Sequence, residues 1–201
     1  MGELFIHDLN PYLDAYGCDV FVETGTGKGT GLLHALRYRF KELYSIEIMK
    51  ELFEECQKNI TDPRIHLLNT NSIEGLKTIL GELDPGIPTL FWLDAHFPGA
   101  DFHFNSYDHL SDQPELHKPL REEIKLVASY RPNCKDVLII DDLQIYEEGP
   151  FEIQMRDFKE KYGEDGLDFV EEAFGETHNF TRDYRHQGFL ILTPKEVENE
   201  D

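Results

Sequence analysis

The sequence has few basic residues for its length. Its 201 residues include 19 Lys and Arg against 40 Asp and Glu, so the formal net charge is -21. Binding to nucleic acid needs clustered positive charge that contacts phosphates. The composition therefore argues against a nucleic-acid partner, and the simplest interpretation of the excess acid is a solvated surface. Residues 194–201 are expected to form an acidic, frayed tail.

Long apolar runs and cysteine pairs are also missing. No stretch approaches the ~20 consecutive apolar residues of a membrane-spanning helix. The N-terminus lacks the basic region and apolar run of a secretion signal. The three cysteines, Cys18, Cys56 and Cys134, are odd in number and have no metal-ligand spacing. These absences predict no membrane association and favour a reduced, cytoplasmic compartment.

Short apolar runs alternate with helical patterns along the chain. Such alternation is typical of βαβ units around a parallel sheet. The runs at 91–93 and 137–140 are continuously apolar, as strands buried on both faces should be. Strands are expected at 19–23, 43–47, 64–68, 89–94, 136–140 and 188–193, and helices at about 29–39, 49–60, 72–81, 115–130 and 151–162.

The C-terminal part of the chain departs from this alternation. Residues 167–193 show no clear crossover helix between their β-like stretches, so they are predicted to form a hairpin that ends the sheet with an antiparallel strand. The expected fold is one α/β domain over residues 1–193. Its sheet would be doubly wound and Rossmann-like, mostly parallel, with helices on both faces.

A glycine-rich turn follows the first predicted strand. Residues 19–29 read Asp-Val-Phe-Val-Glu-Thr-Gly-Thr-Gly-Lys-Gly, and a helical pattern begins directly afterwards. Such a turn presents backbone N–H groups to a ligand that approaches closely. The dinucleotide fingerprint would need glycine at Thr30, and the Walker pattern fails because Gly29 follows Lys28. A turn that only packs a helix on the sheet is the structural alternative.

Polar side chains end each predicted strand. Open α/β sheets bind ligands at the carboxyl ends of their strands. This regularity predicts a ligand site along one edge of the sheet. The residues concerned are Glu23, Glu47, the run from Asn69 to Ser72, Asp94, Asp141 and Asp142.

Three of these carboxylates, those of Asp94, Asp141 and Asp142, follow two strands expected to be neighbours. They repel one another unless a cation lies between them, and oxygen ligands suit a hard divalent ion such as Mg²⁺. The alternative for Asp141 or Asp142 is to cap the segment that follows.

The pattern Glu-x-Gly-x-Gly-x-Gly resembles the first motif of the class I S-adenosylmethionine (SAM)-dependent methyltransferases. The resemblance implies that Glu47 accepts hydrogen bonds from the ribose hydroxyls. It also implies that Asn71 and Ser72 lie at the adenine, with Asp94 nearby. The alternatives are an acid favoured by a helix dipole for Glu47, and helix capping for Asn71 or Ser72. The residues that would lie at the amino-acid end of the cofactor are Glu23, Thr24, Gly25, Gly27 and Gly29.

The stretches Leu-Asp-Ala-His (93–96) and Ile-Ile-Asp-Asp (139–142) resemble the metal-dependent O-methyltransferases that act on sugars. The resemblance implies that Asp94, Asp141 and Asp142 hold a metal, which would activate and align a substrate hydroxyl. His96 would be the general base; the alternative is a histidine that hydrogen-bonds loop backbone. The chain departs from these enzymes in lacking an N-terminal extension or helical cap.

The sequence therefore predicts SAM-dependent methyl transfer to a small-molecule acceptor, and the expected acceptor atom is a hydroxyl oxygen activated by a divalent metal such as Mg²⁺. Two alternatives stay open: N-methylation without a metal, with Asp94 or His96 contacting the acceptor, and a catalytically silent SAM- or nucleotide-binding module. The polar, aromatic segment 97–119 is expected to shape the acceptor pocket.

Overall fold

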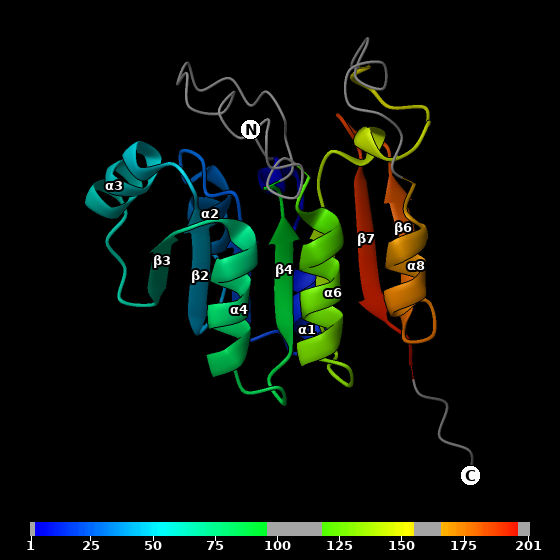
Figure 1. Ribbon diagram of the computed structural model, residues 1–201, viewed down its shortest axis with the longest axis horizontal. Coiled ribbons are helices and arrows are strands. Elements are labelled where there is room, and N and C mark those ends of the chain that lie inside the picture. Colours follow the sequence, from blue (N-terminus) through cyan, green and yellow to red (C-terminus); the bar gives the residue numbers. More distant parts are fainter. Residues whose placement is uncertain (1–2, 96–117, 155–165, 197–201) are drawn as a thin grey trace.

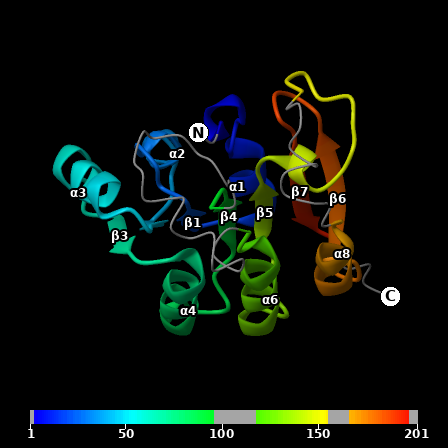
Figure 2. The same cartoon turned by 45° about the horizontal axis from the view of Figure 1, so that its top comes forward.

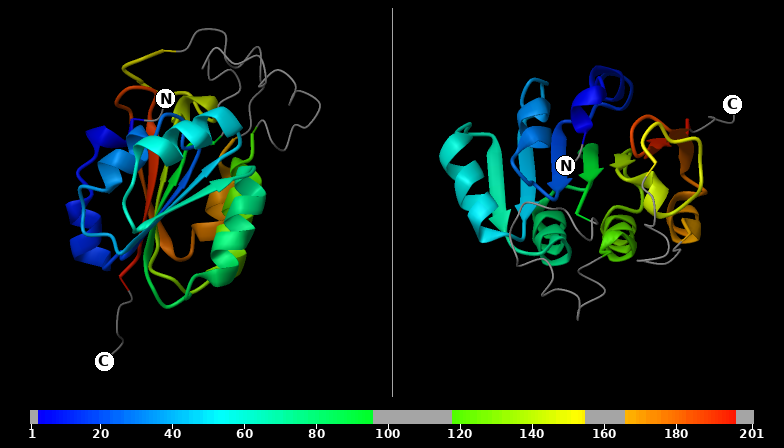
Figure 3. Two further views of the ribbon diagram at one scale, coloured as in Figure 1. Left: turned by 90° about the vertical axis from the view of Figure 1, so that its left-hand side faces the viewer. Right: turned by 90° about the horizontal axis from the view of Figure 1, so that it is seen from above.

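The computed structural model describes residues 3–95, 118–154 and 166–196. In these ranges a central sheet is covered by helices on both faces (Figures 1 and 3). The strands are β1 (Val20–Thr24), β2 (Glu42–Glu47), β3 (Ile65–Asn69), β4 (Thr89–Leu93), β5 (Val137–Ile140), β6 (His178–Asp183) and β7 (Phe189–Pro194). The α-helices are α1 (Asn10–Tyr16), α2 (Thr30–Ala35), α3 (Lys50–Asn59), α4 (Ser72–Glu82), α6 (Leu120–Tyr130) and α8 (Asp168–Phe174), with 3₁₀ turns η1 (Leu4–Ile6) and η3 (Leu143–Ile145).

The strand order is β3-β2-β1-β4-β5-β7-β6. Strands β1 to β5 pair in parallel, whereas β7 runs antiparallel to both of its neighbours. The chain winds from β1 outward through β2 and β3, then returns to place β4 on the other side of β1. This reversal puts the topological switch point between β1 and β4, where open α/β sheets bind their ligands.

The sheet separates two apolar cores, and the helices that cover them lie on opposite sides of it (Figure 2). Side chains alternate along each strand, so Val22 and Leu93 face helices α4, α6 and α8. Phe21 and Trp92 face the other way, toward η1, α1 and α2. The central strands are buried on both faces, as their continuous apolar sequence predicts.

The predicted fold class is confirmed. All six predicted strands are present within one or two residues of their expected ends, and the antiparallel last strand is β7, paired with β6 in a hairpin. Strand β7 extends through Pro194, and the N–H of Lys195 donates to the Thr177 carbonyl at 2.8 Å, so the expected tail begins with residues that pair with the sheet. The single-domain assignment stays a prediction.

Several helices differ from expectation. Helix α2 ends at Ala35, before the expected residue 39, and α6 begins at Leu120, with residues 118–119 not helical. Helix α8 lies in the segment where no helix was expected, and its short length explains why no periodic pattern was recognised. Helix α1 was also unexpected; proline lies in its first turn and Gly17 ends it in a left-handed conformation. In the helix expected at 151–162, residues 151–154 are not helical and 155–162 lie outside the described residues.

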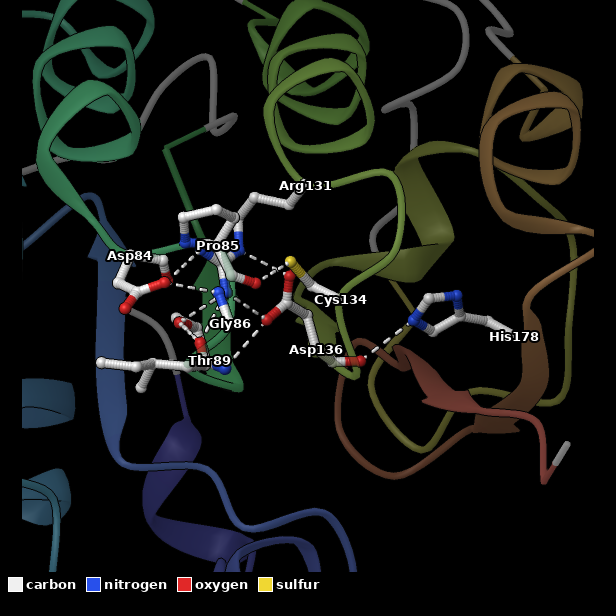
Figure 4. Close-up of polar contacts among 9 residues, drawn as sticks. Asp84, Pro85, Gly86, Thr89, Arg131, Cys134, Asp136 and His178 are labelled. Carbon is white, nitrogen blue, oxygen red and sulfur yellow. Dashed lines mark hydrogen bonds and ion pairs between the residues drawn. The ribbon is translucent and has the colours of Figure 1, made fainter.

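A buried ion pair joins several elements at the amino edge of the sheet (Figure 4). The Arg131 guanidinium, just after α6, donates to the Asp136 carboxylate over 2.7 Å and 2.9 Å. Asp136 also accepts the backbone N–H of Thr89 at 2.8 Å, and its carbonyl oxygen lies 3.0 Å from the His178 ring nitrogen. This network fastens α6, β4, β5 and β6 together on the edge opposite the glycine turn.

Each helix within the described ranges falls short of the combined length and hydropathy that spanning a bilayer requires.

Candidate functional site at the carboxyl edge of the sheet

The glycine turn between β1 and α2 depends on left-handed backbone. Gly25, Gly27 and Gly29 have φ of 81°, 54° and 76°. A Cβ at Gly25 would lie 2.5 Å from the carbonyl oxygen of Asp94, which directly follows β4. The turn therefore packs backbone against backbone at the switch point, where side chains other than glycine do not fit.

Glu47, at the end of β2, holds this turn in place. Its Oε2 accepts the N–H of Gly27 at 2.8 Å, and its Oε1 accepts the N–H of Met49 at 2.7 Å. Burial raises the pKa of Glu47, and these backbone hydrogen bonds lower it in part. Since Met49 precedes α3, the alternative role of an acid at a helix start is observed. Each carboxylate oxygen has a second lone pair, so this bracing does not prevent contact with a ribose hydroxyl.

Glu23, in β1, is only 1% exposed, and its side chain lies against Ser45 of β2 and Gly31 of α2. Ser45 Oγ donates its proton to Glu23 Oε2 at 2.5 Å. Thr26 Oγ1 lies 2.6 Å from Ser45 Oγ and is therefore the donor in the hydrogen bond between these two hydroxyls. Burial raises the pKa of Glu23 to about 8; the Ser45 hydrogen bond lowers it and the charge of Glu47 raises it. A Cβ at Gly31 would lie 2.1 Å from Glu23 Oε1, so α2 sits directly on this carboxyl group.

Asn71 and Ser72 begin helix α4. Asn71 Oδ1 accepts the N–H of Glu74 at 2.9 Å, so the capping alternative is observed for this residue. Ser72 is buried in the first turn. Asn69 Nδ2 donates to the Glu47 carbonyl at 2.8 Å and so connects the ends of β3 and β2.

The structure brings Asp94, Asp141 and Asp142 together. Strands β4 and β5 pair with Leu93 opposite Ile140, and the N–H of Asp141 donates to the Leu93 carbonyl at 3.1 Å. Burial and then the charges of Asp141 and Asp142 raise the pKa of Asp94 well above its usual range. Burial and then Asp142 do the same to the pKa of Asp141, and burial raises the pKa of Asp142 to about 6.

The donor chemistry of these three carboxyl groups suits a hard cation, because a positive charge would relieve their repulsion. The positions of these carboxyl groups are less favourable for metal binding than their chemistry. Within residues 3–95, 118–154 and 166–196, no group of three or more His, Cys, Asp or Glu side chains is gathered as metal ligands are. The magnesium site therefore stays a prediction. The expected base, His96, lies outside the described residues.

Three contributors to this edge were not anticipated. Ser45 and Gly31 support Glu23, and Glu123 of α6 is completely buried beside Thr24 and Ser72. A signal for Glu123 exists in the sequence, since it interrupts the apolar spacing of Leu120, Ile124 and Val127.

Comparison with protein-family models and with curated protein sequences gives no match. Solved structures of similar fold include a Staphylococcus aureus protein provisionally described as a caffeoyl-CoA O-methyltransferase, with a TM-score of 0.65, 10% identity, and coverage of 97% of this chain and 85% of that one. The O-methyltransferase TomG from Streptomyces achromogenes, solved with SAM, has a TM-score of 0.58, 12% identity, and coverage of 94% and 78%. An O-methyltransferase from Bacillus cereus, solved with SAH, has a TM-score of 0.53, 14% identity, and coverage of 93% and 79%.

At these identities the likeness shows the fold. The chain has the Rossmann-like fold of the class I methyltransferases, in agreement with the resemblance of its glycine motif.

Proposed function

We propose that this protein transfers a methyl group from SAM to a small-molecule acceptor. The observation that carries the proposal is the hydrogen bond from Gly27 to Glu47, which joins the glycine turn to the next strand end at the switch point. In this proposal the turn receives the amino-acid end of the cofactor, Glu47 the ribose, and Asn71 and Ser72 the adenine. Solved methyltransferases of the same fold with bound SAM or SAH support the cofactor class.

The proposed acceptor atom is a hydroxyl oxygen. Its lone pair attacks the methyl carbon, the carbon–sulfur bond breaks with its electrons going to sulfur, and the hydroxyl proton leaves to a base. Asp94 lies beside the glycine turn and is the described group best placed to orient the acceptor. His96, two residues further on, is the proposed base.

The proposal also includes a divalent metal at the acceptor site. Asp94, Asp141 and Asp142 would hold it, and the ion would supply Lewis-acid activation of the acceptor oxygen. The competing candidate is metal-free methyl transfer to nitrogen. In that candidate, Asp94 or His96 would contact the acceptor.

The setting of the proposed activity follows from composition. With a formal net charge of -21, the protein is proposed to act on a small molecule and not on nucleic acid. The odd number of cysteines without metal-ligand spacing supports a reduced, cytoplasmic compartment. A catalytically silent cofactor-binding module is the remaining alternative, and it predicts binding without turnover on any acceptor.

The test is calorimetric titration of the whole protein with S-adenosylhomocysteine, with and without Mg²⁺. We expect micromolar binding that Glu47→Gln weakens. A change in affinity or heat on adding Mg²⁺, lost in Asp141→Asn and kept in the exposed control Asp8→Asn, would support the metal site. Binding that ignores Mg²⁺ would favour metal-free transfer, and no binding in either condition would overturn the proposed function.

A further inference from the structure

Glu123 is a carboxyl group enclosed in the apolar interior. It lies in the first turn of α6 and is 0% exposed. Leu120, Ile124 and Val127, on the same face of the helix, are also 0% exposed and pack toward the sheet. Among the described residues, neither oxygen of the Glu123 carboxyl group has a hydrogen-bond partner.

Two hydroxyl groups lie close to this carboxyl group. Burial raises the pKa of Glu123 to about 7, and the hydroxyls of Ser72 and Thr24 lower it in part. Both hydroxyls therefore lie at the margin of hydrogen-bonding contact with the carboxyl group.

Thr24 and Ser72 belong to two different elements that meet at the carboxyl edge of the sheet. Thr24 ends β1 and precedes the glycine turn, and its Oγ1 accepts the N–H of Asp94 at 3.3 Å. That bond uses an acceptor site of the Thr24 hydroxyl and leaves its proton available to donate toward Glu123. Ser72 opens α4, directly after Asn71. One buried carboxyl group thus faces both the β1–β4 junction and the start of α4.

Packing alone does not account for a glutamate here. A buried carboxyl group without partners lowers stability, and an apolar side chain of similar shape would complete the surrounding face. Buried groups that are unfavourable for stability and lie beside a cleft are candidates for a functional role.

We propose that Glu123 is a positioning residue of the cofactor site, which orients the Thr24 and Ser72 hydroxyls and through them sets the spacing between the glycine turn, Asp94 and the start of α4. The inference rests on the proposed binding of SAM. It assigns no contact between Glu123 and the cofactor. It predicts that stability and cofactor affinity respond in opposite directions when the carboxyl group is removed.

The test compares Glu123→Met, Glu123→Gln and the control Glu122→Gln. Glu122 is a partly exposed neighbour on the same helix that pairs with Lys125. Each whole protein is titrated with S-adenosylhomocysteine, and its thermal unfolding is followed. We expect Glu123→Met to raise the unfolding midpoint by ~2–4 °C and to weaken binding by ~10-fold. Glu123→Gln should bind with intermediate affinity, because its amide can still contact both hydroxyls. Glu122→Gln should match the unsubstituted protein.

The outcomes separate this inference from the proposed function. If the unsubstituted protein does not bind S-adenosylhomocysteine, the proposed function fails and this inference fails with it. If the unsubstituted protein binds and Glu123→Met binds equally well, only the positioning role is overturned. A joint loss of stability and affinity in Glu123→Met would show a packing role and would also overturn it. If Glu123→Met does not fold, weaker binding by a folded Glu123→Gln supports the role, and unchanged binding overturns it.

Discussion

The backbone N–H of Gly27 and the carboxylate of Glu47 are joined by a hydrogen bond of 2.8 Å across two neighbouring strand ends. The other oxygen of the same carboxylate accepts the N–H of Met49 at 2.7 Å, before α3. A single buried side chain therefore satisfies backbone donors on two separate connections of the sheet. This links the shape of the glycine turn to the position of β2, on which the proposed ribose contact depends.

Replacement of Glu47 by Gln should weaken both the turn and the proposed cofactor site. Glutamine offers one carbonyl oxygen, so one of the two backbone N–H groups loses its acceptor, at about 1–3 kcal/mol. We expect a lower unfolding midpoint and S-adenosylhomocysteine affinity reduced by ~10-fold in calorimetry. Glu42→Gln, at the exposed start of the same strand, is the control and should change neither. Equal behaviour of the two variants would contradict the bracing role.

Alanine at Gly31 should destabilise the protein, although alanine favours helices. The added Cβ would lie 2.1 Å from Glu23 Oε1, and the buried carboxyl group cannot easily move away because Ser45 holds its other oxygen, Oε2. We expect a loss of about 1–3 kcal/mol in denaturant unfolding. Gly81→Ala provides the comparison, because nothing lies within 4 Å of its added Cβ in helix α4, and a gain of ~1 kcal/mol is expected there. If both substitutions changed the free energy of unfolding in the same direction, close packing of α2 on Glu23 would be contradicted.

Glu23 should make the protein less stable as pH rises from about 5 to 8. Its pKa of about 8 in the folded protein lies above the ordinary value of 4.5, so between these values the folded protein keeps a proton that the unfolded chain releases. The free energy of unfolding that this proton contributes is present below pH 4.5 and is lost as pH approaches 8.

The check is the unfolding midpoint of the unsubstituted protein and of Glu23→Gln, measured at several pH values from 5 to 8. Because glutamine does not titrate, the decline should be shallower in the variant, whatever other groups contribute to both curves. Parallel curves would show that the carboxyl group is not held in its protonated form.

Loss of the Arg131 side chain should be the most damaging change at the amino edge. Arg131→Met leaves the Asp136 carboxylate, itself 2% exposed, without its cation (Figure 4). A cost of about 3–5 kcal/mol is expected, measured by denaturant unfolding. The exposed pair of Lys41 and Asp19 serves as the control, and Lys41→Met should cost less than about 1 kcal/mol. A small effect at Arg131 would mean that Asp136 is solvated or neutral in the folded protein.

The sequence was sufficient to predict the strands of the sheet and many of the residues at its carboxyl edge. Continuous apolar strands and a glycine turn have strong local signals, and the rule that ligands bind at strand ends selected Glu47, Asp94 and Asp141 without knowledge of distances. Helix α8 was missed because seven residues give too few repeats to establish a period. Glu123 was missed because the role proposed for it depends on Thr24 and Ser72, which approach it only after three separate segments have packed.

The hydrogen bonds of Glu47 and Asn71 show a second limit of prediction from sequence. Both residues were predicted at the edge, but their hydrogen bonds in the structure go to backbone groups of this chain. Residue type and spacing indicate that a carboxylate or an amide will lie at a strand end. They do not tell which of several nearby donors it will bind.

The insertion of β7 between β5 and β6 has a consequence for the emerging polypeptide. Strand β5 is entirely apolar and completely buried, yet the neighbour that covers its outer edge lies about fifty residues later in the sequence. Until residues 189–194 have left the ribosome, the nascent domain therefore exposes an unpaired hydrophobic strand, the kind of edge on which chains aggregate. Premature termination before this strand should thus produce insoluble fragments and not a smaller functional domain.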